Sequence, residues 1–340
     1  MDIEFTENDV VIDYEWGRTH LLARILDLKI DQDENIYLAD AKRAGVIKIS
    51  PSGTLLAEIG GRGQGPGEFR EPSRLFLSRR NDLYVFDSQS RKIVKFDDRG
   101  AYVNRIPIRN ISGFPPPVWT DFFVDYRGHT FLVYRELIYD KSSFHSVFEI
   151  DARGNSVRTV ARFLEESMEK GLSSGGGVMG SAIHQYTPRV FLSSSGPHFY
   201  FGCSDDSRII MMNNLGEEVQ VVVIADKTVP ISAEEKKHFE HAFRNHPGML
   251  KLPDARPLYS NLLCDETDRL YLVRTKSVLD KTPGAIIDVL SAEGDFLSRI
   301  RSPIAPHAVR FGRIYAVELN DLGEYRILSA EIPGVSSWKD

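Results

Sequence analysis

The 340-residue sequence predicts an all-β fold, a six-bladed β-propeller made of four-stranded antiparallel blades. Two observations predict it. A short hydrophobic strand that carries an aromatic residue recurs six times, and a turn ending in glycine follows it in five of the six repeats. A four-stranded unit with a period of about 40 to 50 residues is typical of a propeller blade.

The aromatic strands set the spacing of the blades. We use the aromatic residue of each of these strands as the marker of its blade. The first three markers, Tyr37, Tyr84 and Phe131, follow one another at intervals of 47 residues. The next intervals, to Tyr200, Tyr271 and Tyr315, are 69, 71 and 44 residues. Two intervals are long. We therefore expect insertions after blades three and four, at about 163–187 and 226–257.

Each turn begins with Ser, Asp or Asn and ends with Gly. A short side chain of this kind accepts a hydrogen bond from its own turn, and glycine tolerates a positive φ angle. We expect these turns to join the third and fourth strands of five blades. They are Ser50–Gly53, Asp97–Gly100, Asp151–Gly154, Asn213–Gly216 and Ser291–Gly294.

The sixth blade lacks a fourth strand of its own. Its third strand, Tyr325–Ile332, lies close to the end of the chain. A closed ring leaves no unpaired edge at this blade, so the missing strand should come from the N-terminus, where Val10–Tyr14 is the best candidate. We predict one domain over residues 1–340, with the ring closed by this N-terminal strand.

The composition excludes several classes of protein. Hydrophobic residues make up 42% of the chain and charged residues 26%, with a formal net charge of −6. This balance argues against nucleic-acid binding through bulk charge. No apolar run approaches the length of about 18 residues that a membrane span needs. Cys203 and Cys264 are the two cysteines, which is too few for a disulfide framework or a cysteine metal site.

Residues 59–72, with the glycines of Gly60–Gly67 followed by Phe69 and Pro72, precede a strand and then Leu83–Asp87. This segment resembles the NHL repeat and the bacterial six-bladed propellers related to it. The resemblance is specific over residues 25–108. It implies a propeller whose relatives include protein-binding and RNA-binding domains, extracytoplasmic sensors, metal-dependent amidating lyases and lactonase-like hydrolases. The chain shows no signal peptide, although the resemblance allows an exported protein whose leader has been removed.

The insertions predict helices on one face of the ring. Residues 165–177 have the composition of a short polar helix that leads into a glycine stretch. Ser232 and Glu235 have the spacing of a capping box, which predicts a helix from there to about Asn245. Phe239 and Phe243 share one stripe of this helix and could pack onto the propeller. With His184 they form a possible lid; equally, the insertions could only plug the channel.

Counting back from each marker to the start of the innermost strand reaches a polar residue in every blade. Four of these residues lie ten positions before their markers, and those of blades four and six lie eleven and eight before theirs. The differences predict a turn one residue longer in blade four and two shorter in blade six. The ring predicted to surround the channel mouth is Asp27, Arg74, Asp121, Arg189, Asn261 and His307.

This polar ring has three interpretations. Its arginines and carboxylates could bind a polar or anionic ligand. Because Asp27, Arg74, Asp121 and Arg189 alternate in sign, they could instead form structural ion pairs between blades. A divalent metal, calcium or zinc, is the third interpretation, but the amidating-lyase pattern calls for several channel histidines and the ring has only His307.

We expect a non-enzymatic binding propeller that acts without a cofactor and without catalytic residues. Its ligand would be a peptide, a protein partner or a small polar ligand, held at the channel mouth and on the insertion-bearing face. We also expect a monomer. A metal-dependent hydrolase or lyase at the same mouth is the alternative.

Overall fold

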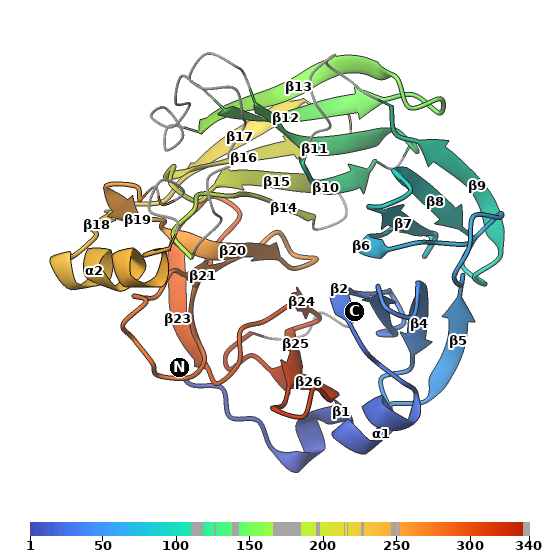
Figure 1. The fold of residues 1–340 in the computed structure, drawn as a ribbon, viewed down its shortest axis with the longest axis horizontal. Coiled ribbons are helices and arrows are strands. Elements are labelled where there is room, and N and C mark those ends of the chain that lie inside the picture. The colour runs from blue at the N-terminus through green and yellow to red at the C-terminus, as the bar shows by residue number, and fades with distance from the viewer. Residues whose placement is uncertain are drawn as a thin grey trace.

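The computed structural model describes residues 1–109, 118–125, 127–137, 143–165, 185–194, 198–213, 215, 217–225, 228–245, 250 and 252–335. Six four-stranded antiparallel sheets are arranged around a common centre (Figure 1). The predicted fold class is therefore confirmed. No helix in the described part of the chain has the length and apolar character needed to cross a bilayer.

The blades follow one another along the chain, and each runs from the innermost strand outward. Blade one comprises β2 (Ile25–Ile30), β3 (Ile36–Asp40), β4 (Gly45–Ile49) and β5 (Leu55–Ile59). Blade two comprises β6 (Pro72–Leu77), β7 (Leu83–Asp87), β8 (Lys92–Phe96) and β9 (Tyr102–Pro107). Blade three comprises β10 (Val118–Val124), β11 (Thr130–Leu137), β12 (Ser143–Ile150) and β13 (Ser156–Glu165).

The other three blades have the same order of strands. Blade four comprises β14 (Val190–Ser194), β15 (His198–Cys203), β16 (Arg208–Asn213) and β17 (Glu218–Val223). Blade five comprises β20 (Tyr259–Cys264), β21 (Leu270–Arg274), β22 (Ala285–Leu290) and β23 (Phe296–Ser302). Blade six comprises β24 (Ala308–Arg310), β25 (Arg313–Leu319), β26 (Tyr325–Glu331) and the N-terminal β1 (Val10–Ile12).

The N-terminal strand closes the ring as predicted. Strand β1 pairs with β26 in antiparallel orientation, and Ile12 is buried in the core shared by blades six and one. The strand is shorter than Val10–Tyr14, because Asp13 accepts a hydrogen bond from the backbone N–H of Trp16 and caps the helix α1 (Tyr14–Thr19). A single turn of 3-10 helix, Glu7–Asp9, precedes the strand.

Hydrophobic clusters between neighbouring sheets hold the described blades together. Each of six clusters takes its residues mainly from two adjacent blades, as where Tyr37 and Val46 of blade one meet Phe69 and Val85 of blade two. Burial of apolar side chains stabilises the ring by about 25 cal/mol per Å². The core is thus distributed around the ring, and the centre is left to the polar ends of the innermost strands.

The predicted turns form on the face opposite the insertions. Gly53, Gly100, Gly154 and Gly294 each donate their backbone N–H to the first residue of the turn and have positive φ angles. The turn at Asn213 is only partly described. These short connections leave the other face to carry the long segments.

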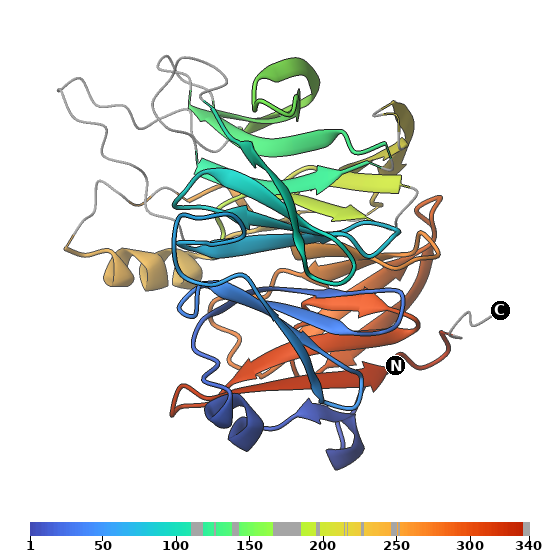
Figure 2. The same cartoon turned by 90° about the vertical axis from the view of Figure 1, so that its right-hand side faces the viewer.

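The described part of the insertions contains one helix and one small sheet. Helix α2 (Ala233–Ala242) projects from one face of the ring (Figure 2), near the pair β18 (Val229–Pro230) and β19 (Ala255–Arg256). The predicted capping box between Ser232 and Glu235 is present, although the helix ends at Ala242 rather than near Asn245. The helix predicted after Glu165 lies outside the described residues.

Candidate functional site: the central cavity

A cavity of about 850 Å³ lies where the innermost strands of all six blades converge. Its volume is in the range typical of small-molecule sites. All six residues of the predicted ring line this cavity: Asp27, Arg74, Asp121, Arg189, Asn261 and His307. The structure thus brings together residues that are up to 280 positions apart in the chain.

A β-bulge places four of these residues at the mouth. The pairing of the first two strands shifts at the same point in blades one, two, three and five. The residue after each shift is Asp27, Arg74, Asp121 or Asn261. A bulge leaves one backbone group without its ladder partner and turns a side chain in a new direction.

Three of the bulge side chains accept the hydrogen bond of the following backbone N–H. The Oδ1 atoms of Asp27, Asp121 and Asn261 each lie 2.8 to 3.0 Å from that nitrogen. Arginine cannot accept a hydrogen bond. In blade two, the N–H of Leu75 instead donates to Oδ2 of Asp27, at 2.8 Å.

Arg74 of blade two in turn donates a hydrogen bond to the backbone of blade one. Its Nη1 atom donates to the carbonyl oxygens of Leu26, at 3.2 Å, and Ser73, at 3.0 Å. Within the described residues, no ion pair links Arg74 to Asp27 or Asp121, and blades one and two are joined here by hydrogen bonds between side chains and backbone. Carbonyl partners leave the charge of Arg74 available to a ligand.

Lys29 is a cavity residue that the sequence analysis missed. Its Nζ atom lies 3.2 Å from Oδ1 of Asp27 and pairs with it. Lys29 follows Asp27 by two positions on β2, and alternate residues of a strand share one face. The polar pair in an otherwise apolar strand was the signal that could have revealed it.

The predicted turn lengths in blades four and six were wrong. The length of the turn between the first two strands follows from the residue just before each marker and its partner on the innermost strand. In blade one, Ile36 pairs with the residue six positions earlier. In blades four and six, Phe199 and Ile314 pair with residues five positions earlier. Both turns are one residue shorter than in blade one. The prediction had one of them longer and the other two residues shorter.

Arg189 and His307 therefore do not occupy the strand position that Asp27, Arg74, Asp121 and Asn261 share, although they reach the same cavity. In blade four, Phe191 pairs with Gly202 and takes the place equivalent to Asp27, so Arg189 lies just before β14 and is exposed. His307 precedes β24 and lies one residue from the equivalent position, because Ala308 pairs with the marker Tyr315. Both still line the cavity.

Enclosure by the ring of blades shifts the pKa values of two side chains at the mouth, Asp121 and His307. Burial raises the pKa of Asp121, and the nearby charges of Arg74 and Lys29 oppose this shift. Burial lowers the pKa of His307, against the attraction of Asp27. The side chain of His307 is accessible from the cavity, and a pKa below its ordinary value of 6.5 leaves the imidazole neutral at pH 7. Its Nδ1 atom accepts the N–H of Val317 at 3.2 Å, which places the ring proton on Nε2.

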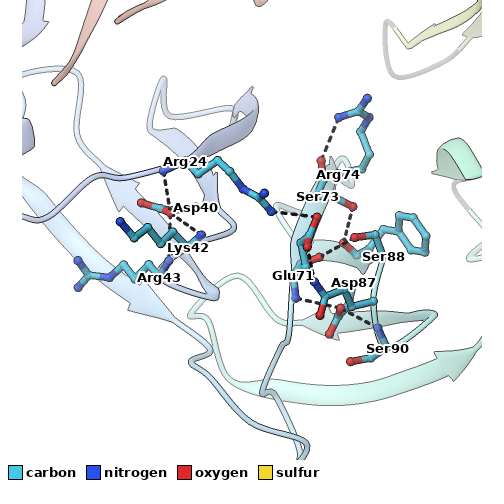
Figure 3. A network of polar contacts seen from close by, with 12 residues as sticks. Arg24, Asp40, Lys42, Arg43, Glu71, Ser73, Arg74, Asp87, Ser88 and Ser90 are labelled. Atoms are coloured by element: carbon cyan, nitrogen blue, oxygen red, sulfur yellow. Dashed lines mark hydrogen bonds and ion pairs between the residues drawn. The ribbon is translucent and has the colours of Figure 1, made fainter. Parts of the chain in front are cut away.

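Buried carboxylates anchor the loops around the mouth. Asp40 accepts hydrogen bonds from the backbone N–H groups of Ala23 and Arg24 as well as those of its own turn. Asp87 does the same for Arg70 and Glu71 (Figure 3). Both aspartates lie three residues after the aromatic marker of their blade. They fix the segments that enter the innermost strands of blades one and two.

The two described lid candidates pack into a cluster of their own. Phe239 is 4% exposed and meets the ring of Tyr186, with centroids 5.1 Å apart, and Phe243 packs at the edge of the same cluster. His184 lies outside the described residues. The packing holds α2 against residues 186 and 278, so the helix is anchored rather than suspended over the mouth.

The described residues of the cavity do not suit a divalent metal. They contain no group of three His, Cys, Asp or Glu side chains in positions to hold an ion. Both carboxylate oxygens of Asp27 already accept hydrogen bonds, and the Lys29 ammonium group lies against one of them. A cation would meet Lys29 and Arg74 at the same mouth.

Comparisons with known proteins agree with this architecture. The sequence matches a family model described as a 6-bladed beta-propeller over residues 17–157. The chain is a six-bladed β-propeller. No curated protein matches the sequence.

Solved structures are similar in fold at low identity. A candidate exported protein from Bacteroides fragilis is 13% identical, with a TM-score of 0.54, and the match covers 97% of this chain and 94% of that one. A calcium-binding protein, regucalcin, from Agrobacterium tumefaciens is 12% identical, with a TM-score of 0.50 and coverage of 99% and 97%. At such identities the similarity shows the fold alone.

Proposed function

We propose that this chain is a non-enzymatic binding propeller that holds a peptide, a protein partner or a small polar ligand at the channel mouth and on the insertion-bearing face. The observation that carries the proposal is the convergence of six polar side chains from six blades on one cavity.

The distribution of charge favours an anionic group at the mouth. On the insertion side, the described lining has three cations, Lys29, Arg74 and Arg189, and two acids, Asp27 and Asp121. Burial raises the pKa of one of these acids, Asp121, which weakens its repulsion of an anion. Neutral Asn261 and His307 complete the ring. A carboxylate would meet guanidinium and ammonium donors, which bind it through charge-assisted hydrogen bonds.

The opposite end of the cavity has the reverse excess. There the lining has Arg79 and Arg310 with three acids, Asp125, Asp265 and Glu266. The field along the channel is therefore polarised, and it should orient a charged ligand with its negative end toward the insertion-bearing face.

The double variant Arg74→Ala with Arg189→Ala tests the proposal. A panel of small carboxylates, sugars and peptides with free C-termini is added to the purified protein, and ligands are detected by the rise in melting temperature, since ligand at 100 times its Kd stabilises by about 2.7 kcal/mol. We expect the rise with an anion to be abolished in the double variant. Arg99→Ala with Arg153→Ala removes the same charge from exposed turns and is the matched control. An unchanged rise in the double variant would reject this site.

The enzymatic alternative has one observation in its favour. His307 presents a neutral imidazole to the cavity, which is the form a general base needs. Elemental analysis of the purified protein distinguishes the two functions. Stoichiometric zinc or calcium that is lost in His307→Ala would support the metal-dependent hydrolase or lyase over simple binding.

A further inference from the structure

The cavity changes character directly beneath its polar mouth. The next inward-facing layer consists of the residues that pair with the aromatic markers, and three of these are Phe76, Phe123 and Leu263. Phe191 of blade four lies in the layer above, where blades one, two, three and five place polar residues. All four line the cavity. We call them the apolar belt: Phe76, Phe123 and Leu263 lie below the charged rim, and Phe191 extends the belt up to it.

Three side chains of this belt expose carbon surface to the cavity. Phe76, Phe191 and Leu263 are only half-buried although they lie near the axis of the ring. Phe123 differs, because it stacks on Phe131 with centroids 4.5 Å apart and is 1% exposed. Apolar surface that faces a cavity in the centre of a protein gains free energy when a ligand covers it.

Neighbouring aromatic rings hold this surface in place. Phe76 meets Tyr84 and Phe122 with centroids 6.3 and 6.4 Å apart, and Phe191 meets Tyr259 at 5.7 Å. Contacts of this kind fix ring orientations. The belt is therefore a preformed wall, and little ordering of side chains opposes binding.

The ammonium group of Lys29 lies outside the apolar belt. It occupies the marker-paired position in blade one, but its ammonium group lies 3.2 Å from Asp27 at the mouth. The aliphatic stem can cover apolar surface while the charged group stays with polar partners. Cations and apolar surface are thus separated along the channel, cations at the mouth and hydrocarbon beneath.

We infer that the ligand is an amphiphilic anion, a carboxylate whose head binds Arg74 and Lys29 and whose apolar tail lies against Phe76, Phe191 and Leu263. This inference rests on the proposed binding function and names its ligand class. Neither a fully polar anion nor a neutral hydrocarbon would use both layers. The volume of about 850 Å³ accommodates a head and a tail of several carbons.

Titration calorimetry with acetate, butyrate, hexanoate and octanoate tests the ligand class. We expect affinity to rise by about fourfold for each methylene that is buried. Arg74→Gln should weaken the whole series by a similar factor and leave its slope unchanged. Phe191→Ser should flatten the slope, while Phe296→Ser, which alters a 60% exposed ring on β23, should change neither.

The two proposals fail in different ways. Equal affinity along the series, or tight binding of gluconate without any gain from a tail, would overturn the amphiphilic ligand and leave the polar binding site intact. No binding of any member of the series would also overturn it. Phe191→Leu keeps most of the apolar volume and should retain the slope. An unfolded Phe191→Ser protein would lose affinity for the whole series, whereas loss of the apolar wall removes only the gain with tail length.

Discussion

A buried acid, together with the aromatic cluster, fastens helix α2 to the propeller, and replacing that acid should loosen the helix. Glu235 is 1% exposed and lies in the first turn of α2. Its Oε2 atom accepts the N–H of Ser232 at 2.9 Å, and its Oε1 atom accepts the hydroxyls of Ser277, at 2.6 Å, and Tyr186. One carboxylate thus caps the helix and ties it to two other segments.

The magnitude follows from these hydrogen bonds. In Glu235→Gln an amide NH₂ replaces one of the two acceptor oxygens, so either the cap or the hydroxyl contacts are lost. Two charge-assisted hydrogen bonds of roughly 1.5 kcal/mol each give a loss of about 3 kcal/mol. A loss of that size raises the population of the detached helix roughly a hundredfold.

Hydrogen exchange measures this opening directly. We expect the backbone amides of residues 236–242 to exchange roughly a hundredfold faster in Glu235→Gln, while those of the blades stay protected. Glu234→Gln alters the adjacent, exposed acid of the same turn and is the matched control. Equal protection of α2 in the two variants would show that the reasoning is wrong.

The same contact predicts a dependence on pH. Burial alone would raise the pKa of Glu235, but hydrogen bonds from Ser277, Tyr186 and Ser232, with the charge of Arg256, outweigh it and lower the pKa to about 2. A carboxylate with a lowered pKa contributes stability above its unfolded value, near 4.5. The helix should therefore loosen as the pH falls from about 4.5 toward 2, and Glu235→Gln should not show this loosening.

Two further predictions concern the mouth. Asp87→Asn should lower the free energy of unfolding in urea by about 2 kcal/mol, because one buried oxygen that accepts backbone N–H groups is lost; Asp98→Asn in an exposed turn should cost less than about 0.5 kcal/mol, and equal effects would contradict the anchoring role. Burial lowers the pKa of His307, so the unfolded chain binds more protons below pH 6.5 and stability should fall there. His307→Gln should flatten this fall between pH 7 and 5, and parallel profiles of the two proteins would contradict the lowered pKa of His307.

The sequence predicted the fold because its repeats are local signals. An aromatic strand and a glycine turn need only neighbouring residues to be recognised, and they predicted the number of blades. The strand missing from blade six then pointed to Val10–Tyr14, of which Val10–Ile12 forms the closing strand. The capping box of Ser232 and Glu235 was predicted for the same reason. The pairing of Glu235 with Tyr186 and Ser277 joins segments more than 40 residues apart, and no local pattern contains it.

The sequence predicted which six polar residues line the cavity, but not the strand register of those in blades four and six. Counting back from the markers reached the right residues in blades with a β-bulge, since Asp27 and Asn261 lie at a fixed distance from theirs. In blades four and six the turns are shorter, so Arg189 and His307 reach the mouth from different backbone positions. Lys29 was missed because the count stopped at one residue per blade, and the apolar belt depends on which way each ring faces.

The pairing of β1 with β26 has a consequence for the newborn chain. The first strand leaves the ribosome about 320 residues before its partner is complete, an interval of roughly 15 to 60 s at ordinary rates of synthesis. Throughout that time the part of the Ile12 core that blade six supplies does not yet exist, and β1 has no partner strand to pair with. The speed of translation, or a chaperone bound to the segment of β1, should therefore affect the fraction of molecules in which the ring closes.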